Sequence, residues 1–485
     1  MFSFTNIARY HQELLNNQTS CTDAVNYYLT NIESQQKLNA FMEVYAQEAI
    51  ERAAQLDQQR KEGSPIKKLH GVVIALKDVL CYKDHVVTAG SNILKGFTSL
   101  YTASAVQYLL DEEAIIIGTC NCDEFAMGST NENSAYGPVL NALDNSKVPG
   151  GSSGGSAVAV QADMCMLSLG SDTGGSVRQP ADFCGIIGLK PGYGRISRYG
   201  LIAYASSFDQ IGIFGKEIND VALLLDVMSN PDEYDSTMET SAPQVPFTQY
   251  HSAPDKKFRV AYFKQMLEHP SLDPEIKTAI FAQIHQLKKD GHTVEEVSFN
   301  LIDHIVPTYY VLTTAEASSN LSRYDGVRYG YRSEKETDDL TTFYLNNRSE
   351  SFGMEVKRRI MLGTFVLSAG FYDAYFNKAQ QVRKQLHDHI SLLFNQFDVI
   401  ILPTSPVTAF SLGEKDKDPI AMYLADIFTV FANLTGIPAI SLPLFSHSNG
   451  LPFGLQAMVN KQDELTLLQF SNMLMHHKKR VTDLV

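Results

Sequence analysis

Apolar residues recur every three or four positions in three N-terminal segments, at 7–15 (IARYHQELL), 24–29 and 41–56. This spacing places the apolar side chains on one face of a helix, so we predict that residues 1–62 are helical. Ser20 and Thr22 could cap the second helix, because a hydroxyl at the start of a helix can accept from its free N–H groups.

Short apolar runs indicate buried strands farther along the chain. Strands are predicted at 71–76 (GVVIAL), 114–118 (AIIIG), 258–263, 292–299, 398–402, 439–444 and 451–459. Helices are predicted at 104–112 and 273–289, over most of 301–395, and at 464–475. Strands that alternate with helices are typical of an α/β fold with a largely parallel sheet. The polar, proline-rich stretch 231–256 predicts a long surface loop or a sub-domain boundary.

The composition of the 485 residues narrows the class of protein. Hydrophobic residues make up 44% and charged residues 19%, which is ordinary for a globular protein. The net charge of −14 argues against a protein that holds nucleic acid by its own electrostatics, although a nucleic-acid substrate could be held by a partner. We find neither an apolar run that approaches the 18 or so residues of a membrane span nor a secretory signal pattern, so we expect a cytoplasmic protein with no membrane contact.

The six cysteines all lie in the first 184 residues. Cys120 and Cys122 form a C-x-C pair, but no second pair follows at the spacing of a zinc site. We therefore predict buried, reduced thiols and no metal site.

Residues 150–200 hold 12 of the 31 glycines of the chain. Glycine at this density destabilises a structure unless the backbone turns tightly or approaches a ligand. The glycines alternate with apolar segments such as SAVAVQADMCMLSLGSD, which argues against a flexible linker.

Two motifs in this segment could carry chemistry. Residues 150–154 (GGSSG) satisfy G-x-S-x-G, the nucleophile elbow of the α/β-hydrolases, but the polar segment 144–149 that precedes them does not predict the strand which that elbow requires. The lysine-containing phosphate loop and the GxGxxG pattern are both missing. In residues 172–176 (DTGGS), two glycines precede Ser176, so consecutive N–H groups can form a nest for an oxyanion beside a serine nucleophile.

A serine nucleophile needs a base. The chain has no histidine between His85 and His251, so this region offers no nearby Ser-His pair. Lys77 ends an apolar strand, where desolvation would lower its pKa and let the neutral amine accept a proton. Taken alone, Lys77 is better explained as a solvated lysine at the end of a strand.

Three motifs together resemble the amidase-signature family. They are LHGVVIALKD around Lys77, GGSSGG around Ser152, and DTGGS ending at Ser176, and the intervals of 75 and 24 residues between these three side chains agree with the family. The resemblance implies an α/β fold with a mixed sheet covered by helices on both faces. It also implies a Ser–cis-Ser–Lys triad, with Ser176 as nucleophile, Ser152 as bridging serine and Lys77 as base. The oxyanion hole would be formed by the backbone amides of Thr173, Gly174, Gly175 and Ser176.

Four further segments are similar to those of one branch of the family, the glutaminase subunits of three-subunit, tRNA-dependent amidotransferases. They are 123–138 (DEFAMGSTNENSAYGP), 192–201 (GYGRISRYGL), 356–363 (VKRRIMLG) and 423–429 (YLADIFT). This resemblance implies that glutamine is the amide donor and that Arg359, or the adjacent Arg358, binds its α-carboxylate while Asp426 binds its α-ammonium. The alternative for each of these residues is a surface ion pair.

The same resemblance predicts how the chain is organised and what it works with. We expect one domain over residues 1–485, with N-terminal helices at 1–62, a core at about 69–225 and a helical and C-terminal part at about 257–485. The resemblance further implies two partner subunits, a misacylated Glu-tRNA(Gln) held mainly by a partner, and ATP with Mg²⁺ at that partner rather than in this chain. Two alternatives stay open, a stand-alone amide hydrolase with the same triad and a catalytically silent scaffold subunit.

Overall fold

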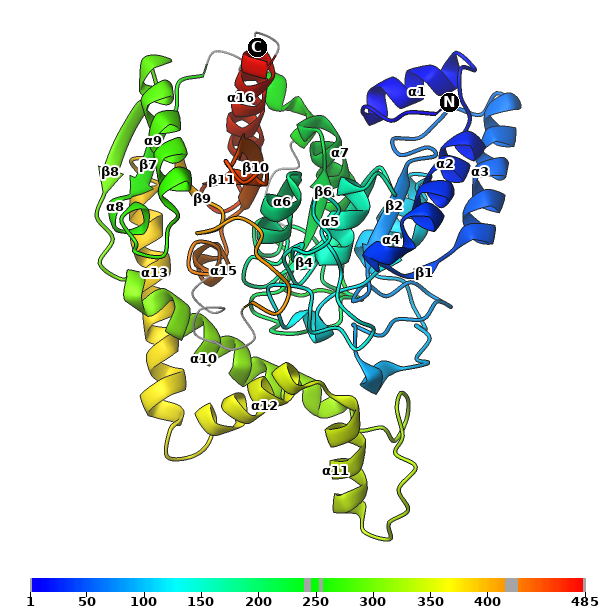
Figure 1. Ribbon diagram of the computed structural model, residues 1–485, viewed down its shortest axis with the longest axis vertical. Coiled ribbons are helices and arrows are strands. Elements are labelled where there is room, and N and C mark those ends of the chain that lie inside the picture. The colour runs from blue at the N-terminus through cyan, green and yellow to red at the C-terminus, as the bar shows by residue number, and fades with distance from the viewer. Residues whose placement is uncertain (1, 240–245, 253–255, 415–425, 483–485) are drawn as a thin grey trace.

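The computed structural model describes residues 2–239, 246–252, 256–414 and 426–482. These residues contain eleven strands that form one sheet, in the order β1-β3-β2-β4-β6-β5-β10-β11-β9-β7-β8 (Figure 1). The strands are β1 (Phe41–Val44), β2 (Val73–Lys77), β3 (Ile115–Cys120), β4 (Leu167–Asp172), β5 (Ile187–Lys190), β6 (Gln210–Gly215), β7 (Arg259–Phe263), β8 (Thr293–Val297), β9 (Val399–Pro403), β10 (Ala439–Ser446) and β11 (Pro452–Met458).

The sheet is mixed. The pairs β2–β3, β2–β4, β7–β8 and β7–β9 are parallel, and the other pairs are antiparallel. The prediction of a largely parallel sheet is therefore wrong, whereas the mixed sheet implied by the family resemblance is confirmed. The reason is that β5 and β6, like β10 and β11, are joined by loops without a crossover helix, so each pair runs antiparallel.

Helices cover both faces of the central strands. Every residue of β2, β3, β4, β5 and β6 is buried, and because successive side chains point to opposite faces, both faces must be covered. The helices are α1 (Ile7–Leu15), α2 (Cys21–Ser34), α3 (Ala46–Lys61), α4 (Ser104–Asp111), α5 (Gly154–Gln161), α6 (Arg178–Cys184), α7 (Ile218–Met228), α8 (Lys264–Leu267), α9 (Pro274–Lys289), α10 (Ile302–Asn320), α11 (Leu340–Ser351), α12 (Met354–Val366), α13 (Lys378–Leu393), α15 (Val430–Thr435) and α16 (Glu464–Thr482).

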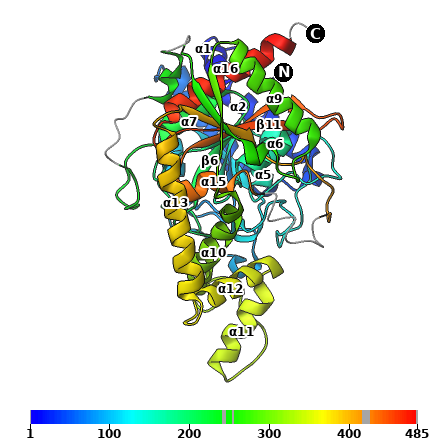
Figure 2. The ribbon, with the colours of Figure 1, turned by 90° about the vertical axis from the view of Figure 1, so that its left-hand side faces the viewer.

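The N-terminal helices and the helical segment 301–395 occupy different parts of the molecule. Helices α1, α2 and α3 lie at the β1 end of the sheet, and β7, β8 and α9 lie at the other end (Figure 1). Helices α10, α12 and α13 extend below the sheet, and α11 lies farthest from it in both views (Figures 1 and 2). Segment 301–395 is thus mostly helical, as predicted.

One predicted helix is partly wrong. The segment 41–56 begins as β1, whose residues pair with β3, and only then continues as α3. A short run such as FMEV satisfies helix and strand spacing equally well, and it is the pairing with β3 that decides. Ser20 is the N-cap of α2 and accepts from the N–H of Asp23, which confirms one of the two predicted caps.

The loop predicted at 231–256 is only partly within the described residues, since 240–245 and 253–255 lie outside them. Its described part includes a 3₁₀ helix at Phe247–Ser252. All six cysteines are buried and unpaired, as predicted. Within the described ranges, no helix is long and apolar enough to cross a membrane, and no group of three or more His, Cys, Asp or Glu side chains could hold a metal ion.

Candidate active site

Lys77 lies at the carboxyl end of β2, beside the carboxyl end of β4. Parallel strands present their carboxyl ends at one edge, where α/β proteins place their binding sites. The side chain of Lys77 is fully buried, and its Nζ donates to Ser152 Oγ at 2.7 Å and to Ser171 Oγ at 2.9 Å. The solvated lysine that the sequence alone favoured is therefore wrong.

Burial lowers the pKa of Lys77 to about 8, although the nearby Cys122, Asp123 and Asp172 raise it. Desolvation is the largest cause, because a low-dielectric surrounding disfavours the charged ammonium. The amine can therefore lose its proton near neutral pH, as a base requires.

Ser152 and Ser176 lie on adjacent backbone segments. The peptide bond between Gly151 and Ser152 is cis, as the family resemblance implied, and the N–H of Ser153 donates to the carbonyl oxygen of Ser176 at 3.2 Å. Ser152 is fully buried, whereas Ser176 is 8% exposed and so is the more accessible of the two. The hydroxyl groups of Ser152 and Ser176, both among the described residues, are not hydrogen-bonded to each other.

The amide loop 173–176 follows β4 directly. Gly175 has a φ of +128°, and a Cβ at this position would lie 2.3 Å from Thr429 Oγ1, so a side chain is excluded. The N–H of Gly175 donates to Asp172 Oδ1 at 2.9 Å. Of the four amides predicted to form an oxyanion hole, that of Gly175 is thus already used within the loop.

A buried ion pair fixes the base of this loop. Arg178 donates to both carboxylate oxygens of Asp172, at 2.9 and 3.1 Å, and neither side chain is exposed. Burial alone would raise the pKa of Asp172, but the charge and hydrogen bonds of Arg178 hold it well below its usual value. Arg178 also donates to Thr429 O, Gln456 Oε1 and Asn433 Oδ1, so the loop is tied to the C-terminal part of the chain.

Arg359 and Asp426 both contact Tyr310. The hydroxyl of Tyr310 donates to Asp426 Oδ2 at 2.8 Å, and the guanidinium carbon of Arg359 lies 5.4 Å from the centre of the Tyr310 ring. Ser129 also donates to Asp426, at 2.9 Å. Asp426 and Arg359 are both buried, so the surface ion pair considered for each is excluded. Burial raises the pKa of Asp426 to about 6.

The structure distinguishes the two neighbouring arginines on α12. Arg359 is buried, donates to Glu355 Oε1 at 2.8 Å and to Tyr204 Oη at 2.8 Å, and so points into the site. The Arg358 side chain is 46% exposed and pairs with the other oxygen of Glu355. Arg359 is therefore the better candidate for binding an α-carboxylate.

Sequence reasoning missed several residues of this arrangement. Ser171 is one residue before DTGGS and Ser129 lies inside the quoted segment 123–138, but nothing in either motif distinguishes its serine from its neighbours. The places of Tyr310 and Glu355 in the site depend on contacts between α10, α12 and the segment after residue 425. Spacing along the chain does not predict such contacts. In the predicted motif 423–429, residues 423–425 lie outside the described residues.

A mixed α/β sheet with a buried lysine, a cis-linked serine and an amide loop after β4 is the arrangement that the resemblance to the amidase-signature family implies. The model of the amidase family matches residues 23–468. The chain therefore belongs to the amidase-signature family.

Full-length relatives place the chain more closely within the family. It is 46% identical to the A subunit of glutamyl-tRNA(Gln) amidotransferase from Chlorobium phaeobacteroides, over 98% of this chain and 99% of the relative. A crystal structure of the A subunit of glutamyl-tRNA(Gln) amidotransferase from Thermotoga maritima is 38% identical and has a TM-score of 0.77, over 96% of this chain and 93% of that one. A peptide amidase from Stenotrophomonas maltophilia is 24% identical with a TM-score of 0.81, over 98% and 97% of the two chains, and this likeness shows the fold alone.

Proposed function

We propose that this chain is the glutaminase subunit of an aminoacyl-tRNA amidotransferase and releases ammonia from glutamine for the amidation of Glu-tRNA(Gln) by a partner subunit. The observation that carries this proposal is the buried arrangement of Arg359 and Asp426 around Tyr310, in a chain that also has the amidase residues Lys77 and Ser152. The names of the two amidotransferase relatives support the same function.

The triad would act through a chain of proton transfers. Neutral Lys77 takes the proton of the Ser152 hydroxyl, Ser152 takes the proton of Ser176, and Ser176 Oγ attacks the carboxamide carbon of glutamine. The proton returns through Ser152 to the leaving nitrogen, and ammonia departs. Water then hydrolyses the acyl ester to give glutamate and free Ser176. The 2.7 Å contact between Lys77 and Ser152 supports the first transfer.

The oxyanion of each tetrahedral intermediate would be held by the amide loop. Because Gly175 gives its N–H to Asp172, we assign the donors to Thr173, Gly174 and Ser176. Gly175 instead gives the loop its curvature through its positive φ. Donors fixed in a buried loop need no reorganisation when charge develops, which is why such loops stabilise the transition state.

The two ends of free glutamine would be recognised by charge. Arg359 carries the positive charge for the α-carboxylate, and Asp426 carries the negative charge for the α-ammonium. Tyr310 and Ser129 hold the Asp426 carboxylate by hydrogen bonds, and Glu355 holds the guanidinium of Arg359. Such a charged pair favours glutamine over an apolar amide, because an apolar amide offers no opposite charge to either buried group.

The alternative is a stand-alone amide hydrolase with the same triad. The fold does not separate the two functions, because the peptide amidase shares it. The charged pair favours the glutaminase, since a hydrolase of apolar amides has no use for Arg359 and Asp426. A catalytically silent scaffold subunit is disfavoured because Lys77 and Ser152 are in contact and the pKa of Lys77 is lowered.

The outer face of α12 supports a role as a subunit. Helix α12 buries Arg359 on one face and exposes an apolar stripe on the other, formed by Met354, Met361, Leu362 and Phe365. The exposed aromatic residues that follow it are Phe371, Tyr372 and Tyr375. Apolar surface of this kind marks interaction sites in proteins. We therefore propose that a partner subunit covers this face. Following the family resemblance, we further propose two partner subunits, with ATP, Mg²⁺ and most tRNA contacts on a partner, in the cytoplasm.

Ammonia release by the purified chain tests this function. We expect much faster release from glutamine than from butyramide, which has the carboxamide but neither α-group. Co-expression with the two partner subunits should give a stable 1:1:1 complex in which ATP and Glu-tRNA(Gln) raise the rate. The stand-alone hydrolase would be established by a monodisperse monomer that hydrolyses butyramide as fast as glutamine and whose rates do not change when the partner subunits are added.

A further inference from the structure

The turn at residues 204–209 lies between the amide loop and Arg359. The turn is closed by the N–H groups of Phe208 and Asp209, which both donate to Ala205 O at 2.9 Å. It joins the long connection after β5 to the start of β6, and the mechanism proposed above does not use it.

The Asp209 carboxylate holds the turn to the amide loop. It is buried and accepts the backbone N–H of Tyr204 at 2.9 Å and that of Ala205 at 3.0 Å. The hydroxyl of Thr173 donates to the same carboxylate at 2.7 Å. One side chain thus fixes both the first residue of the amide loop and the backbone of Tyr204.

Tyr204 links this turn to Arg359. Its hydroxyl oxygen accepts from Arg359 Nη1 at 2.8 Å, and the guanidinium carbon lies 5.5 Å from the centre of its ring. Apart from Glu355, Tyr204 is the only hydrogen-bond partner that the described residues give to the Arg359 side chain. The position of Tyr204 therefore helps to set where Arg359 points.

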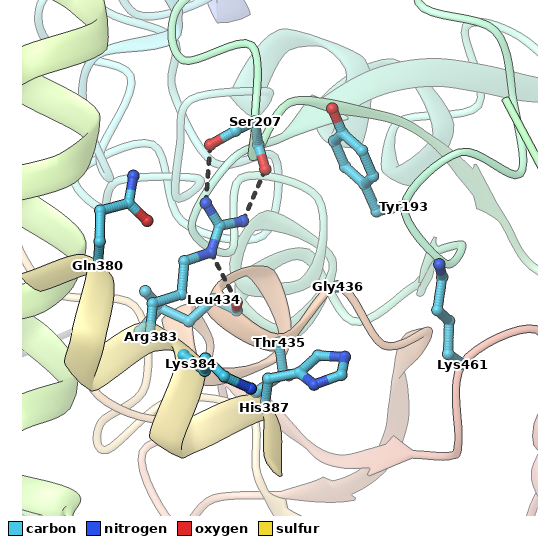
Figure 3. A pocket seen from close by; sticks show the side chains of 10 residues that line it. All are labelled: Tyr193, Ser207, Gln380, Arg383, Lys384, His387, Leu434, Thr435, Gly436 and Lys461. Carbon is cyan, nitrogen blue, oxygen red and sulfur yellow. Dashed lines mark hydrogen bonds between the residues drawn. The ribbon is translucent and has the colours of Figure 1, made fainter. Parts of the chain in front are cut away.

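A second arginine braces the same turn. Arg383 on α13 donates to the hydroxyl and the carbonyl oxygen of Ser207, each at 2.8 Å, and to Leu434 O at 3.0 Å (Figure 3). The N–H of Ser207 donates to Glu316 at 2.9 Å. Arg383 and Ser207 also line a cavity of about 390 Å³. A turn fixed at both Ser207 and Asp209 cannot shift at Tyr204 without disturbing Thr173.

We propose that Asp209 is a positioning residue that couples recognition of the α-carboxylate of glutamine by Arg359 to the alignment of the oxyanion-binding loop at Thr173. The inference rests on the proposed function and deepens it. The two sites share one buried carboxylate, so a change at Thr173 reaches Arg359 through Asp209 and Tyr204, and a change at Arg359 reaches Thr173 by the same contacts. Glutamine bound by its α-groups would then be hydrolysed on a better-aligned loop than a simple amide is.

Asp209→Asn tests the coupling, because an amide of the same shape accepts through only one atom and cannot take all the hydrogen bonds of the carboxylate. We expect it to lower kcat/KM for glutamine about 100-fold and that for butyramide about tenfold, so the preference for glutamine falls about tenfold. Thr173→Val removes the hydroxyl that donates to Asp209. The loss of this one buried hydrogen bond should raise the KM for glutamine five- to tenfold. Because Thr173 lies away from Arg359, such a rise would have to be transmitted through Asp209. Thr173→Ser keeps the hydroxyl and should bring this KM back to within about twofold of the wild-type value.

The double variant and a matched carboxylate complete the test. If Thr173 acts through Asp209, adding Thr173→Val to Asp209→Asn should change the glutamine preference by less than about twofold. Asp220 is a control: it is also buried and accepts one backbone N–H, that of Ile7, at 3.0 Å. Asp220→Asn should lower the melting temperature and leave the glutamine preference unchanged. All variants are measured on the chain together with whatever partner subunits its ammonia release requires.

The outcomes distinguish a failure of the coupling through Asp209 from a failure of the proposed function. Equal losses on glutamine and butyramide in Asp209→Asn, or an unchanged glutamine KM in Thr173→Val, would make Asp209 merely structural and overturn this inference while the proposed function stands. A wild-type chain that shows no preference for glutamine would overturn the proposed function, and the inference with it. Should Asp209→Asn fail to fold, the two Thr173 variants alone decide.

Discussion

Lys77 Nζ lies 2.7 Å from Ser152 Oγ, and both side chains are completely buried. This contact joins the end of β2 to the segment before α5, which are separated by 75 positions in the chain. A charged ammonium in this surrounding is costly, so burial lowers the pKa of Lys77 to about 8 and brings the neutral amine within reach near neutral pH. The chemistry of the site follows from this relationship.

Ser176→Ala should abolish ammonia release from glutamine while the circular dichroism spectrum and the melting temperature stay close to those of the wild type. The alanine lacks the nucleophilic hydroxyl but differs from serine by a single oxygen, so the packing defect should be small. Mass spectrometry of a chain that has been acid-quenched during turnover should find the glutamyl adduct on Ser176. An adduct on Ser152 or Ser153 would show that the nucleophile has been misassigned.

The rate of acylation should rise with pH through a pKa of about 8, because only the neutral form of Lys77 accepts a proton and burial has lowered its pKa to that value. The profile of kcat/KM against pH measures this directly. Lys77→Arg should be inactive at every pH, since arginine stays protonated. A fully active Lys77→Arg enzyme is incompatible with this role.

Arg359→Met should raise the KM for glutamine by an amount equivalent to about 2–5 kcal/mol, which is typical for truncating one partner of a buried charge pair. Hydrolysis of butyramide should change far less, because butyramide has no α-carboxylate. Arg358→Met is the matched control on the same helix, and its exposed side chain should make the change nearly silent. A larger effect from Arg358 than from Arg359 would reverse the assignment.

The KM for glutamine should rise as the pH falls below about 6. Burial raises the pKa of Asp426 to about that value, so protonation removes the negative charge that binds the α-ammonium. Asp426→Asn should abolish this acid limb while raising the KM at neutral pH. An acid limb that persists in Asp426→Asn would have to come from another group.

Asp172→Asn should lower the free energy of unfolding by about 3–5 kcal/mol, because it leaves the fully buried Arg178 without its anion. Urea denaturation at pH 7 measures the loss. The pKa of Asp172 is held low in the folded protein, so its contribution to stability is complete above the unfolded pKa and is lost as the pH falls through the folded one. From about pH 5 downward, stability should therefore fall more steeply in the wild type than in Asp172→Asn.

The parts of the site that lie on continuous motifs could be predicted from the sequence. The apolar run before Lys77 indicated a strand, and the glycines before Ser176 indicated a tightly turning loop, because both depend on local chain properties. The burial of Lys77 could not be predicted from its own segment, since it depends on β4 and on the segment that carries Ser152.

The residues that hold the candidate groups in place were harder to find. Glu355 lies one turn before Arg359 on α12, but only the folded chain shows that it accepts from Arg359 instead of facing solvent. Asp209 acts across 36 positions on Thr173, and no periodicity in the sequence marks that contact. The antiparallel pairing of β5 with β6 could not be predicted either, because it depends on the path of the loop between them, which the pattern of apolar residues does not determine.

The ion pair of Asp172 with Arg178 has a consequence for synthesis of the chain on the ribosome. Arg178 completes its hydrogen bonds with Thr429, Asn433 and Gln456, which are made at least 251 residues later. A nascent chain that ends before Thr429 already contains Lys77, Ser152 and Ser176, yet the guanidinium beneath the amide loop still lacks these three acceptors. Truncated products would therefore carry the three proposed triad side chains without the support that holds the amide loop in shape, so we expect them to leave glutamine intact until translation is nearly finished.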